Sequence, residues 1–403
     1  MALYIDDKSD KSEINENIWN NRISYINELN KFGYNIKIIN NKIIIDNTKV
    51  NLKYNISEEF ICTDLRGGMA LYLLLKLKNI DIKNIRLINK IYIDRGYYNY
   101  DYNIDLIMNT NNIHYNYETS LLSNIKIGGK SKYYVEFNNI TQIKNILLLC
   151  KKYKIKYKII GDGTNIYFDE YYDGIIIKNK LTDINIKKIK NNYFINCTSG
   201  IKLQKLVDIS LNKNIDIINL TGIPGTIGGA LYNNSGAYGL EIKDIIYECL
   251  IIDEFNKIKK LNNKDMKLSY RDSIFKHKNY IILQCRFKLS DKYDNTNNLK
   301  IKYKEIMNIR NSKFQLTNNL GSVFKNVIVN NNKIYAWKIL DDLGYRGKII
   351  DDIKFSDNNP NILINISNNI IDITKFKNII NNIIESTKNL YQLDLHTEIE
   401  LIK

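Results

Sequence analysis

Residues 222 to 239 are unusually rich in glycine and read GIPGTIGGALYNNSGAYG. The whole chain of 403 residues holds 19 glycines and two prolines, and this stretch contains six of the glycines together with Pro224. Glycine allows positive φ and close approach to the main chain, and proline fixes φ where the loop begins. The stretch predicts a rigid surface of backbone N–H groups that suits a phosphate or a flat cofactor. The alternative is a structural turn without a ligand.

A second glycine turn, GDGTN at residues 161 to 165, directly follows a predicted strand at 157 to 160. It has neither the GxGxxG pattern nor a Walker lysine, so neither a Rossmann nor a P-loop interpretation fits. Taken alone, it is better interpreted as an ordinary turn. Paired with the loop at 222 to 239, it makes a second backbone anion site, and two such sites suit a dinucleotide cofactor.

The net charge of +16 comes from 59 Lys and Arg against 43 Asp and Glu. The cations are spread along the chain, without a block of five or more, so we interpret most of them as solvated surface. Nucleic-acid binding stays open as an alternative. Only eight cations are Arg, which makes Arg66, Arg95 and Arg271 stand out as places for a planar, bidentate fork.

The five cysteines are scattered, odd in number and without a CxxC pair. This usage argues against a disulfide framework or a zinc site and predicts reduced, buried thiols in a cytoplasmic protein with no metal centre. The acidic start of the chain is not that of a signal peptide. Lysines interrupt the apolar runs well below the length of a membrane span, so none is expected.

Hydrophobic periodicity and length predict four α/β segments. We place them at residues 1–115, 116–180, 181–295 and 296–403. The first segment is expected to contain helices at 23–31 and 65–78, a hairpin at 35–46 and a strand at 85–93. Further along, we expect strands at 132–137, 157–160, 174–177, 193–197 and 245–253, and helices at 140–153, 202–212, 304–310, 336–342 and 373–390.

Six motifs then occur in one order between residue 120 and the C-terminus. They are Ile127-Gly128-Gly129, the turn at 161–165, the run at 222–229, Gly236-Ala237-Tyr238-Gly239, the segment 270–276 (YRDSIFK) and the segment 321–326 (GSVFKN). Together they resemble the UDP-N-acetylenolpyruvoylglucosamine reductases, flavoenzymes of bacterial cell-wall synthesis. The short interval between Arg271 and Ser322 is similar to the compact type of that family, without an extra insertion.

The resemblance implies an α/β (α+β) architecture. It comprises a two-subdomain FAD-binding fold of the vanillyl-alcohol-oxidase/PCMH type, with its subdomains at residues 116–180 and 181–295, and a substrate-binding α/β domain at residues 296–403. It also implies NADPH, and FAD bound without a covalent link; none of the three histidines lies in a glycine turn where a tether would sit. The implied reaction reduces UDP-N-acetylglucosamine enolpyruvate to UDP-N-acetylmuramate in peptidoglycan synthesis. The implied cofactor-binding residues are Gly161, Asp162, Gly163, Thr164, Asn165, Ile223, Pro224, Gly225, Thr226, Gly228 and Gly229.

Three residues match the catalytic residues of the family. Ser322 matches the proton donor, and Lys325 is a nearby cation that would help it; without the family, Ser322 would be interpreted as a helix N-cap. Arg271 matches the arginine that engages the substrate carboxylate, a task suited to a guanidinium fork, and its alternative is a surface ion pair. Glu398 matches the C-terminal glutamate, with Glu400 as the alternative. The implied substrate-binding residues are Tyr238, Tyr270, Lys325 and Asn326.

The sequence departs from the family pattern at several positions. Asp162 brings a negative charge to a turn where Gly is common, which is expected to weaken FAD binding. Val327 stands where a Pro usually follows Asn326, and Asp351-Asp352 replaces a common Gly-Gly. None of these departures removes a proposed catalytic residue.

The first 110 residues have a separate resemblance. The segments at 18–22, 27–33, 63–66 and 92–97 are similar to the last quarter of UDP-N-acetylglucosamine 1-carboxyvinyltransferase (enolpyruvyl transferase). Arg66 and Arg95 match its phosphoenolpyruvate-binding arginines, and Ile18 a uridine-contacting position, but its catalytic cysteine has no counterpart, and Cys62 is not at that place. Either a separate chain carries the rest of the transferase, or the segment is retained for folding.

Two further functions are weighed against the reductase. One is another flavin oxidoreductase of the same superfamily with a different substrate. The other is a flavin-binding or inactive subunit that complements a split enolpyruvyl transferase. The expected partners are a nucleotide sugar and that separate transferase chain, not nucleic acid or membrane.

Overall fold

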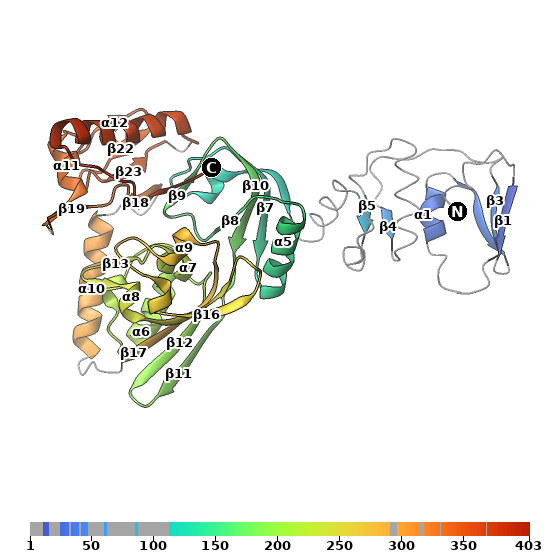
Figure 1. Ribbon diagram of the computed structural model, residues 1–403, viewed down its shortest axis with the longest axis horizontal. Helices are drawn as coiled ribbons and strands as arrows, with labels where there is room; N and C mark the ends of the chain where they lie inside the picture. The colour runs from blue at the N-terminus through green and yellow to red at the C-terminus, as the bar shows by residue number, and fades with distance from the viewer. Residues whose placement is uncertain are drawn as a thin grey trace. The chain divides into compact units, whose positions relative to one another are not determined.

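The computed structural model divides the chain into two compact units, Met1–Ile113 and His114–Lys403 (Figure 1). The structure describes residues 11–15, 25–31, 34–39, 42–46, 60–62, 85–87, 113–290, 296–313, 318–330, 332–367 and 369–403. In these residues no helix is long and apolar enough to cross a membrane.

The N-terminal unit contains a three-stranded antiparallel sheet of order β1-β3-β2, a helix and a short parallel pair β4-β5. The bounds are Lys11–Asn15 (β1), Tyr25–Lys31 (α1), Ile36–Ile39 (β2), Lys42–Asp46 (β3), Phe60–Cys62 (β4) and Ile85–Leu87 (β5). The predicted hairpin is confirmed, because β2 and β3 pair antiparallel from Ile36↔Ile45 to Ile39↔Lys42. The predicted helix at 65–78 lies outside the described residues, as do Ile18, Arg66 and Arg95.

The second unit begins with a four-stranded sheet of order β6-β7-β10-β8. Its elements are β6 (His114–Glu118), β7 (Lys130–Phe137), α5 (Ile140–Lys152), β8 (Tyr157–Ile160) and β10 (Tyr171–Asn179). β10 pairs parallel with both β7 and β8, as expected where helix α5 makes the crossover. Asn139 caps α5 by accepting a hydrogen bond from the Gln142 N–H at 2.9 Å. The parallel β8 ends at Ile160, so the turn at 161–165 leaves the sheet at its carboxyl edge.

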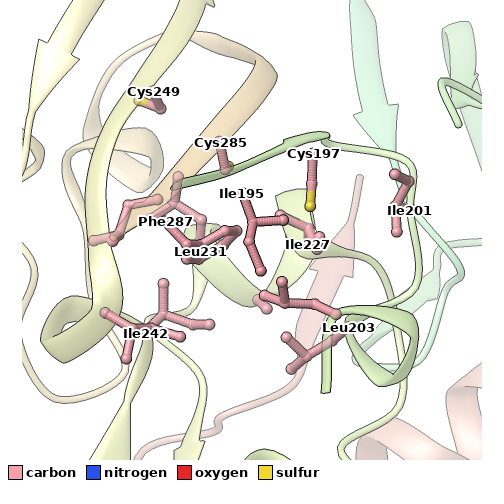
Figure 2. Close-up of a cluster of buried hydrophobic side chains, with 14 of the residues drawn as sticks. Ile195, Cys197, Ile201, Leu203, Ile227, Leu231, Ile242, Cys249, Cys285 and Phe287 are labelled. Atoms are coloured by element: carbon pink, nitrogen blue, oxygen red, sulfur yellow. The ribbon is translucent and has the colours of Figure 1, made fainter. Parts of the chain in front are cut away.

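A five-stranded antiparallel sheet of order β11-β12-β17-β15-β16 follows. Its strands are β11 (Ile184–Ile189), β12 (Asn192–Thr198), β15 (Ile246–Ile252), β16 (Ile258–Asn262) and β17 (Ile281–Ser290), and its helices are α6 (Leu203–Asn212), α7 (Ile227–Tyr232), α8 (Ile242–Ile245) and α9 (Ile274–His277). Figure 2 shows Ile195 and Phe287 of the sheet in one buried cluster with Ile227 and Leu231 of α7. Because α7 begins at the glycine-rich loop, this cluster anchors the loop against the sheet.

The last part holds a third sheet, of order β18-β23-β22-β21. Its elements are α10 (Thr296–Lys313), β18 (Asn319–Ser322), α11 (Ala336–Asp342), β21 (Ile349–Ile350), β22 (Ile353–Phe355), β23 (Ile362–Asn365) and α12 (Ile373–Tyr391), with small pairs β19 (Val327–Val329) with β20 (Asn332–Ile334) and β13 (Gly236–Ala237) with β14 (Leu240–Glu241). The core between α12 and the sheet includes Phe376, Phe355 and Leu363, all fully buried. The sequence predicted α11 with its observed bounds.

The C-terminal strand does not stay in this sheet. β24 (Glu400–Ile402) pairs parallel with β9 (Ile166–Phe168), the strand that directly follows the turn at 161–165. The Glu400 N–H donates to the Asn165 carbonyl at 3.0 Å, and the Asn165 amide donates to the Glu398 carbonyl at 3.0 Å. The end of the chain is thereby fixed beside the predicted cofactor turn; Figure 1 shows the C-terminus next to β9.

Candidate active site

A pocket of about 470 Å³ lies in the second unit and is lined by residues from all three sheets. All eleven predicted cofactor-binding residues lie in its wall, from the turn at 161–165 and from the loop at 223–229. The three predicted catalytic residues, Arg271, Ser322 and Glu398, lie in the same wall. The fold therefore brings together two glycine loops and three reactive side chains that are dispersed along the sequence.

The two glycine loops interlock. A Cβ on Gly161 would lie 2.5 Å from Thr226 Oγ1, and a Cβ on Gly225 would lie 2.8 Å from Thr164 Oγ1. Gly163 (φ +73°) and Gly225 (φ +106°) have backbone conformations that favour glycine, and a Cβ on Gly163 would also overlap the Leu122 carbonyl. These glycines are thus required for the two loops to contact each other, which explains the density of glycine in the sequence.

Only some backbone N–H groups of the two glycine loops are available to donate hydrogen bonds to a ligand. The N–H groups of Ile227, Gly228 and Gly229 donate to Ile201 O, Ser199 O and Thr226 Oγ1, so they are already used inside the fold. Within the residues that the structure describes, the N–H groups of Asp162, Gly163 and Thr164 have no hydrogen-bond partner, and neither do those of Gly225 and Thr226. These five groups line the pocket and fit an anionic, diphosphate-bearing cofactor.

Arg271 and Glu398 form an ion pair in the pocket wall. Arg271 Nε donates to Glu398 Oε1 at 2.6 Å, and the side chains are 19% and 17% exposed, so the pair is largely shielded from solvent. Arg271 has a left-handed backbone (φ +53°). Its carbonyl accepts a hydrogen bond from Lys276 Nζ at 3.0 Å, and its guanidinium lies over the Tyr270 ring. The ion pair, the Tyr270 ring and a hydrogen bond from Nη2 to the Gly236 carbonyl at 3.3 Å hold the guanidinium fork in place without occupying all of its donors.

Glu400 has a different partner. Its Oε1 lies 2.5 Å from Lys158 Nζ, an ion pair between β24 and β8 that also lines the pocket. Burial, and after it the charge and hydrogen bond of Glu400, raises the pKa of Tyr232. Tyr232 therefore stays protonated and can donate to this carboxylate. The two candidate glutamates are thus separated by their partners: Glu398 belongs to the arginine and Glu400 to a lysine and a tyrosine.

Ser322 ends strand β18 and is not the N-cap of a helix, so the structural alternative for it is wrong. It pairs with Ile362 of β23, and Glu398 N–H donates to the carbonyl of the adjacent Val323 at 2.7 Å. Gly321, with φ +74°, precedes it. The short hydrogen bond between the two backbones places the strand end with Ser322 beside the segment that carries Glu398.

None of the four predicted substrate-binding residues is among the described residues that line the pocket. They lie around it. Tyr238 is 48% exposed with φ +50°, and its ring lies 5.7 Å from the Arg310 guanidinium carbon. The Tyr270 hydroxyl accepts from Asn326 Nδ2 at 3.0 Å, while Asn326 Oδ1 accepts from the Ala336 N–H at the start of α11. Lys325 is half-buried, and its charge, after burial, contributes to lowering the pKa of Lys276.

Three charged wall residues were missed at the sequence level. Lys158, Lys278 and Arg310 all line the pocket. Arg310 carried a usable signal, since it is one of only eight arginines, whereas nothing distinguishes Lys158 and Lys278 among so many lysines. The negative charge that Asp162 brings to the cofactor turn is partly balanced by Lys178. Burial is the main cause that lowers the pKa of Lys178, and the charge of Asp162 opposes this effect, so the two groups lie near each other.

Family models and known proteins match this chain over the same region. A model described as "FAD binding domain" matches residues 131–262, and one described as "UDP-N-acetylenolpyruvoylglucosamine reductase, C-terminal domain" matches residues 312–402. The reductase of that name from Fusobacterium nucleatum is 33% identical over 269 residues, which cover 64% of this chain and 90% of that protein. The Listeria monocytogenes reductase is 30% identical over 280 residues, covering 69% and 90%.

A solved structure is similar as well. The crystal structure of the reductase from Thermus caldophilus aligns with a TM-score of 0.59 and 18% identity, covering 72% of this chain and 98% of that one. At this identity the likeness concerns the fold, and it confirms the predicted FAD-binding architecture with mixed α/β content.

Proposed function

This chain belongs to the family of UDP-N-acetylenolpyruvoylglucosamine reductases, and from that premise we propose which of its residues perform the reaction. The enzyme is an NADPH-dependent flavin oxidoreductase. It reduces UDP-N-acetylenolpyruvoylglucosamine to UDP-N-acetylmuramate in the synthesis of peptidoglycan precursors, with FAD as cofactor and NADPH as reductant.

The interlocked glycine loops are proposed to hold FAD. The five available N–H groups at 162–164 and 225–226 would donate to its diphosphate, and glycine at 161, 163 and 225 lets the two loops lie close enough to present these groups together. When bound, FAD supplies the hydride that is added to the enol ether. The remaining steps depend on side chains of this chain.

The reduction adds a hydride and a proton across the carbon–carbon double bond of the enol ether. Hydride addition to the terminal CH2 leaves negative charge on the neighbouring carbon, where the carboxylate delocalises it. The Ser322 hydroxyl is proposed to give its proton to that carbon, which completes the saturated ether. The serine is then an alkoxide and needs a proton from solvent; Lys325, three residues away, and Lys276 add positive charge in this region.

Arg271 is proposed to bind the substrate carboxylate with the part of its fork that Glu398 leaves available. A guanidinium matches a carboxylate in shape and stabilises the negative charge that develops next to it. Glu398 fixes the orientation of the guanidinium through Nε, and its location beside the Ser322 strand suits a role at the reacting carbon. Glu400, engaged with Lys158, is not assigned this role.

A single observation carries these assignments: both glycine loops, the Arg271–Glu398 pair and Ser322 line one pocket. The test is NADPH oxidation by the purified protein with and without UDP-N-acetylenolpyruvoylglucosamine, with the product identified by mass spectrometry. We expect oxidation that depends on the enolpyruvyl nucleotide and a product heavier by two hydrogen atoms. NADPH oxidation that ignores this substrate would indicate another flavin oxidoreductase instead.

The origin and role of the N-terminal unit are a separate proposal. Both family models leave residues 1–115 unmatched. We propose that this segment derives from the C-terminal part of the enolpyruvyl transferase and pairs with a separate chain that carries the remainder. Co-purification with a truncated transferase would support this, and normal transferase activity in cells that lack residues 1–110 would count against it. We also propose that domain boundaries lie near residues 115, 180 and 295.

The cysteines of the second unit bear on where the protein works in the cell. Cys150, Cys197, Cys249 and Cys285 are free and buried in the structure. Burial raises the pKa of the Cys150, Cys197 and Cys249 thiols to about 12. Such protonated, unpaired thiols are typical of a reducing compartment, so we propose the cytoplasm.

A further inference from the structure

Arg271, the residue proposed to bind the substrate carboxylate, has a backbone conformation that an arginine rarely adopts. It occupies the third position of a tight turn in which Ser269 and Asp272 exchange two backbone hydrogen bonds, at 3.1 and 3.2 Å. Its φ is +53°, and a turn with positive φ at this position usually has glycine or asparagine there. Such a strained conformation persists only where the surrounding structure holds it, and it is common at active sites. The contacts of the turn should therefore include the group that holds Arg271.

The two ends of this turn are fixed to the glycine-rich segment by neutral hydrogen bonds. The fully buried Asn234 donates through Nδ2 to the Ser269 carbonyl at 2.8 Å. Ser273, the residue after the turn, donates through Oγ to the Tyr232 carbonyl at 2.6 Å. These two contacts place the turn at the end of helix α7, but neither of them is made to Arg271 itself.

Lys276 contacts the backbone of Arg271 directly. Its Nζ donates to the Arg271 carbonyl at 3.0 Å, and the lysine lies on helix α9, which begins just after the turn. A charged donor makes a stronger hydrogen bond with a carbonyl than a neutral donor does. Lys276 Nζ also lies 5.4 Å from the centroid of the Tyr232 ring, which lines the pocket. The half-buried ammonium is thus held by the carbonyl that it fixes and by an aromatic ring.

The charges around Lys276 connect it to the residues of the site. Burial lowers the pKa of Lys276 most, and the positive charge of Lys325 adds to this effect. Three carboxylates oppose the effect and favour the ammonium form, those of Glu400, Asp272 and Glu398. Glu398 is also the partner of Arg271 Nε, so Arg271 is held at both ends, by Lys276 at its backbone and by Glu398 at its guanidinium.

We propose that Lys276 is a positioning residue for the reaction, because it holds the Arg271 peptide in the left-handed conformation from which the guanidinium reaches the substrate carboxylate. This inference rests on the proposed function, which assigns the carboxylate of the enolpyruvyl group to Arg271. Lys276 is not among the described residues that line the pocket, so it acts through Arg271 and not on the substrate. Without the ammonium, the Arg271 backbone relaxes out of the strained region, and its side chain moves with it.

Two variants of Lys276 and one control separate this role from a general effect on the turn. Lys276→Gln removes the charge, and Lys276→Arg keeps a charged donor. His277→Ala is the matched control, because His277 connects the same helix to the same turn, with Nε2 at 3.0 Å from Asp272 Oδ1. This contact is exposed and does not involve Arg271, so its loss shows what a weaker connection between helix and turn does by itself.

The experiment measures the binding of two ligands to the oxidised full-length holoenzyme by isothermal titration calorimetry. UDP-N-acetylenolpyruvoylglucosamine carries the carboxylate, whereas UDP-N-acetylglucosamine has a hydroxyl group in place of the enolpyruvyl ether. We expect Lys276→Gln to raise the Kd of the enolpyruvyl nucleotide by about 10- to 100-fold, the range for loss of a charged hydrogen bond. The Kd of UDP-N-acetylglucosamine, the retention of FAD and the rate of flavin reduction by NADPH should match the wild type.

The other variants sharpen the test. Lys276→Arg is the safer variant for folding and should raise the Kd of the enolpyruvyl nucleotide by a smaller factor, since it keeps the charge but not the shape of the ammonium. His277→Ala should leave both Kd values unchanged.

Two results would overturn the proposal. An equal rise of both Kd values, or loss of FAD, in Lys276→Gln would give Lys276 a structural role without selectivity for the carboxylate. A preference for the enolpyruvyl nucleotide that is unchanged in both Lys276 variants would show that Arg271 keeps its position without the ammonium. A wild-type protein that does not distinguish the two nucleotides would instead contradict the proposed function.

Discussion

Arg271 Nε and Glu398 Oε1 lie 2.6 Å apart although 127 residues separate them in the chain. The pair forms only because the segment that leads into β24 docks between two partners. Glu398 N–H donates to Val323 O, and Asn165 donates to the Glu398 carbonyl. The same strand positions Glu400 against Lys158, so neighbouring glutamates are directed to different cations.

Glu398→Gln and Glu400→Gln should therefore have unequal effects. The first change removes the charge that orients Arg271, which is proposed to act next to the reacting carbon. We expect kcat to fall about 100-fold, the size of a lost electrostatic contact in a transition state. The second breaks an ion pair with Lys158 and should lower kcat less than about fivefold. Steady-state kinetics with both variants decides, and a larger loss from Glu400→Gln would reverse the assignment.

Ser322→Ala should separate the two halves of the catalytic cycle. In the proposed mechanism the hydroxyl is needed only for proton transfer to the substrate carbon, so reduction of the bound flavin by NADPH should proceed at the wild-type rate. Turnover of the enol ether should fall by about 10²- to 10⁴-fold, the usual contribution of a general acid. Stopped-flow absorbance measures the two steps separately. Loss of both steps would mean that Ser322 has a structural role instead.

Asp162→Asn should tighten the binding of FAD. The carboxylate lies in the turn whose N–H groups are proposed to hold the diphosphate, and repulsion there costs about 1 kcal/mol when water and Lys178 screen it. The expected result is a Kd for FAD lower by about fivefold, measured by titration of the apoprotein. Asp173→Asn is the control, because this carboxylate is 73% exposed and paired with Lys132. Weaker FAD binding in Asp162→Asn would contradict the proposed location of the diphosphate.

Asp169, between β9 and β10, forms an ion pair with Lys377 of helix α12, and the Nζ–Oδ1 distance is 2.8 Å. Burial alone would raise the pKa of Asp169, but the hydrogen bond from Lys377 and the charges of Lys377 and Lys403 hold it below the ordinary value. The ionised form is therefore the stabilising one. Its contribution is present above the unfolded pKa of about 3.9 and is lost as the pH falls through the lowered folded value.

Asp169→Asn should then lower the free energy of unfolding by up to about 1 kcal/mol near neutral pH, because both side chains are only about one-third exposed. The difference from the wild type should shrink as the pH falls below about 4. Urea unfolding at several pH values measures it. A difference that is the same at low and neutral pH would show that the ion pair is not its source.

Local features of this fold were accessible from the sequence because they depend on neighbours in the chain. The two glycine loops were recognisable because Gly163 and Gly225 need positive φ, and α11 because its apolar residues repeat at helical spacing. The interlocking of the loops could not be predicted from the sequence, because Gly161 packs closely against Thr226, which lies far along the chain.

The arrangement of the site could not be predicted in full from the sequence, because its side chains contact partners that are distant in the chain. Periodicity places Glu398 and Glu400 on the same strand face but says nothing about Lys158, which lies 242 residues before Glu400. The geometry also differs from the expectation for Lys325, which is close to Ser322 in sequence but is not among the described wall residues. Tertiary packing, not local propensity, decides which cations reach the pocket.

The most direct test of the whole account is the visible spectrum of the purified full-length protein through one catalytic cycle. We expect the absorbance of oxidised FAD after reconstitution, its loss on addition of NADPH without oxygen, and its return when UDP-N-acetylenolpyruvoylglucosamine is added. A protein that takes up no flavin from excess FAD would contradict the account. A reduced flavin that the enolpyruvyl nucleotide fails to reoxidise would contradict it equally.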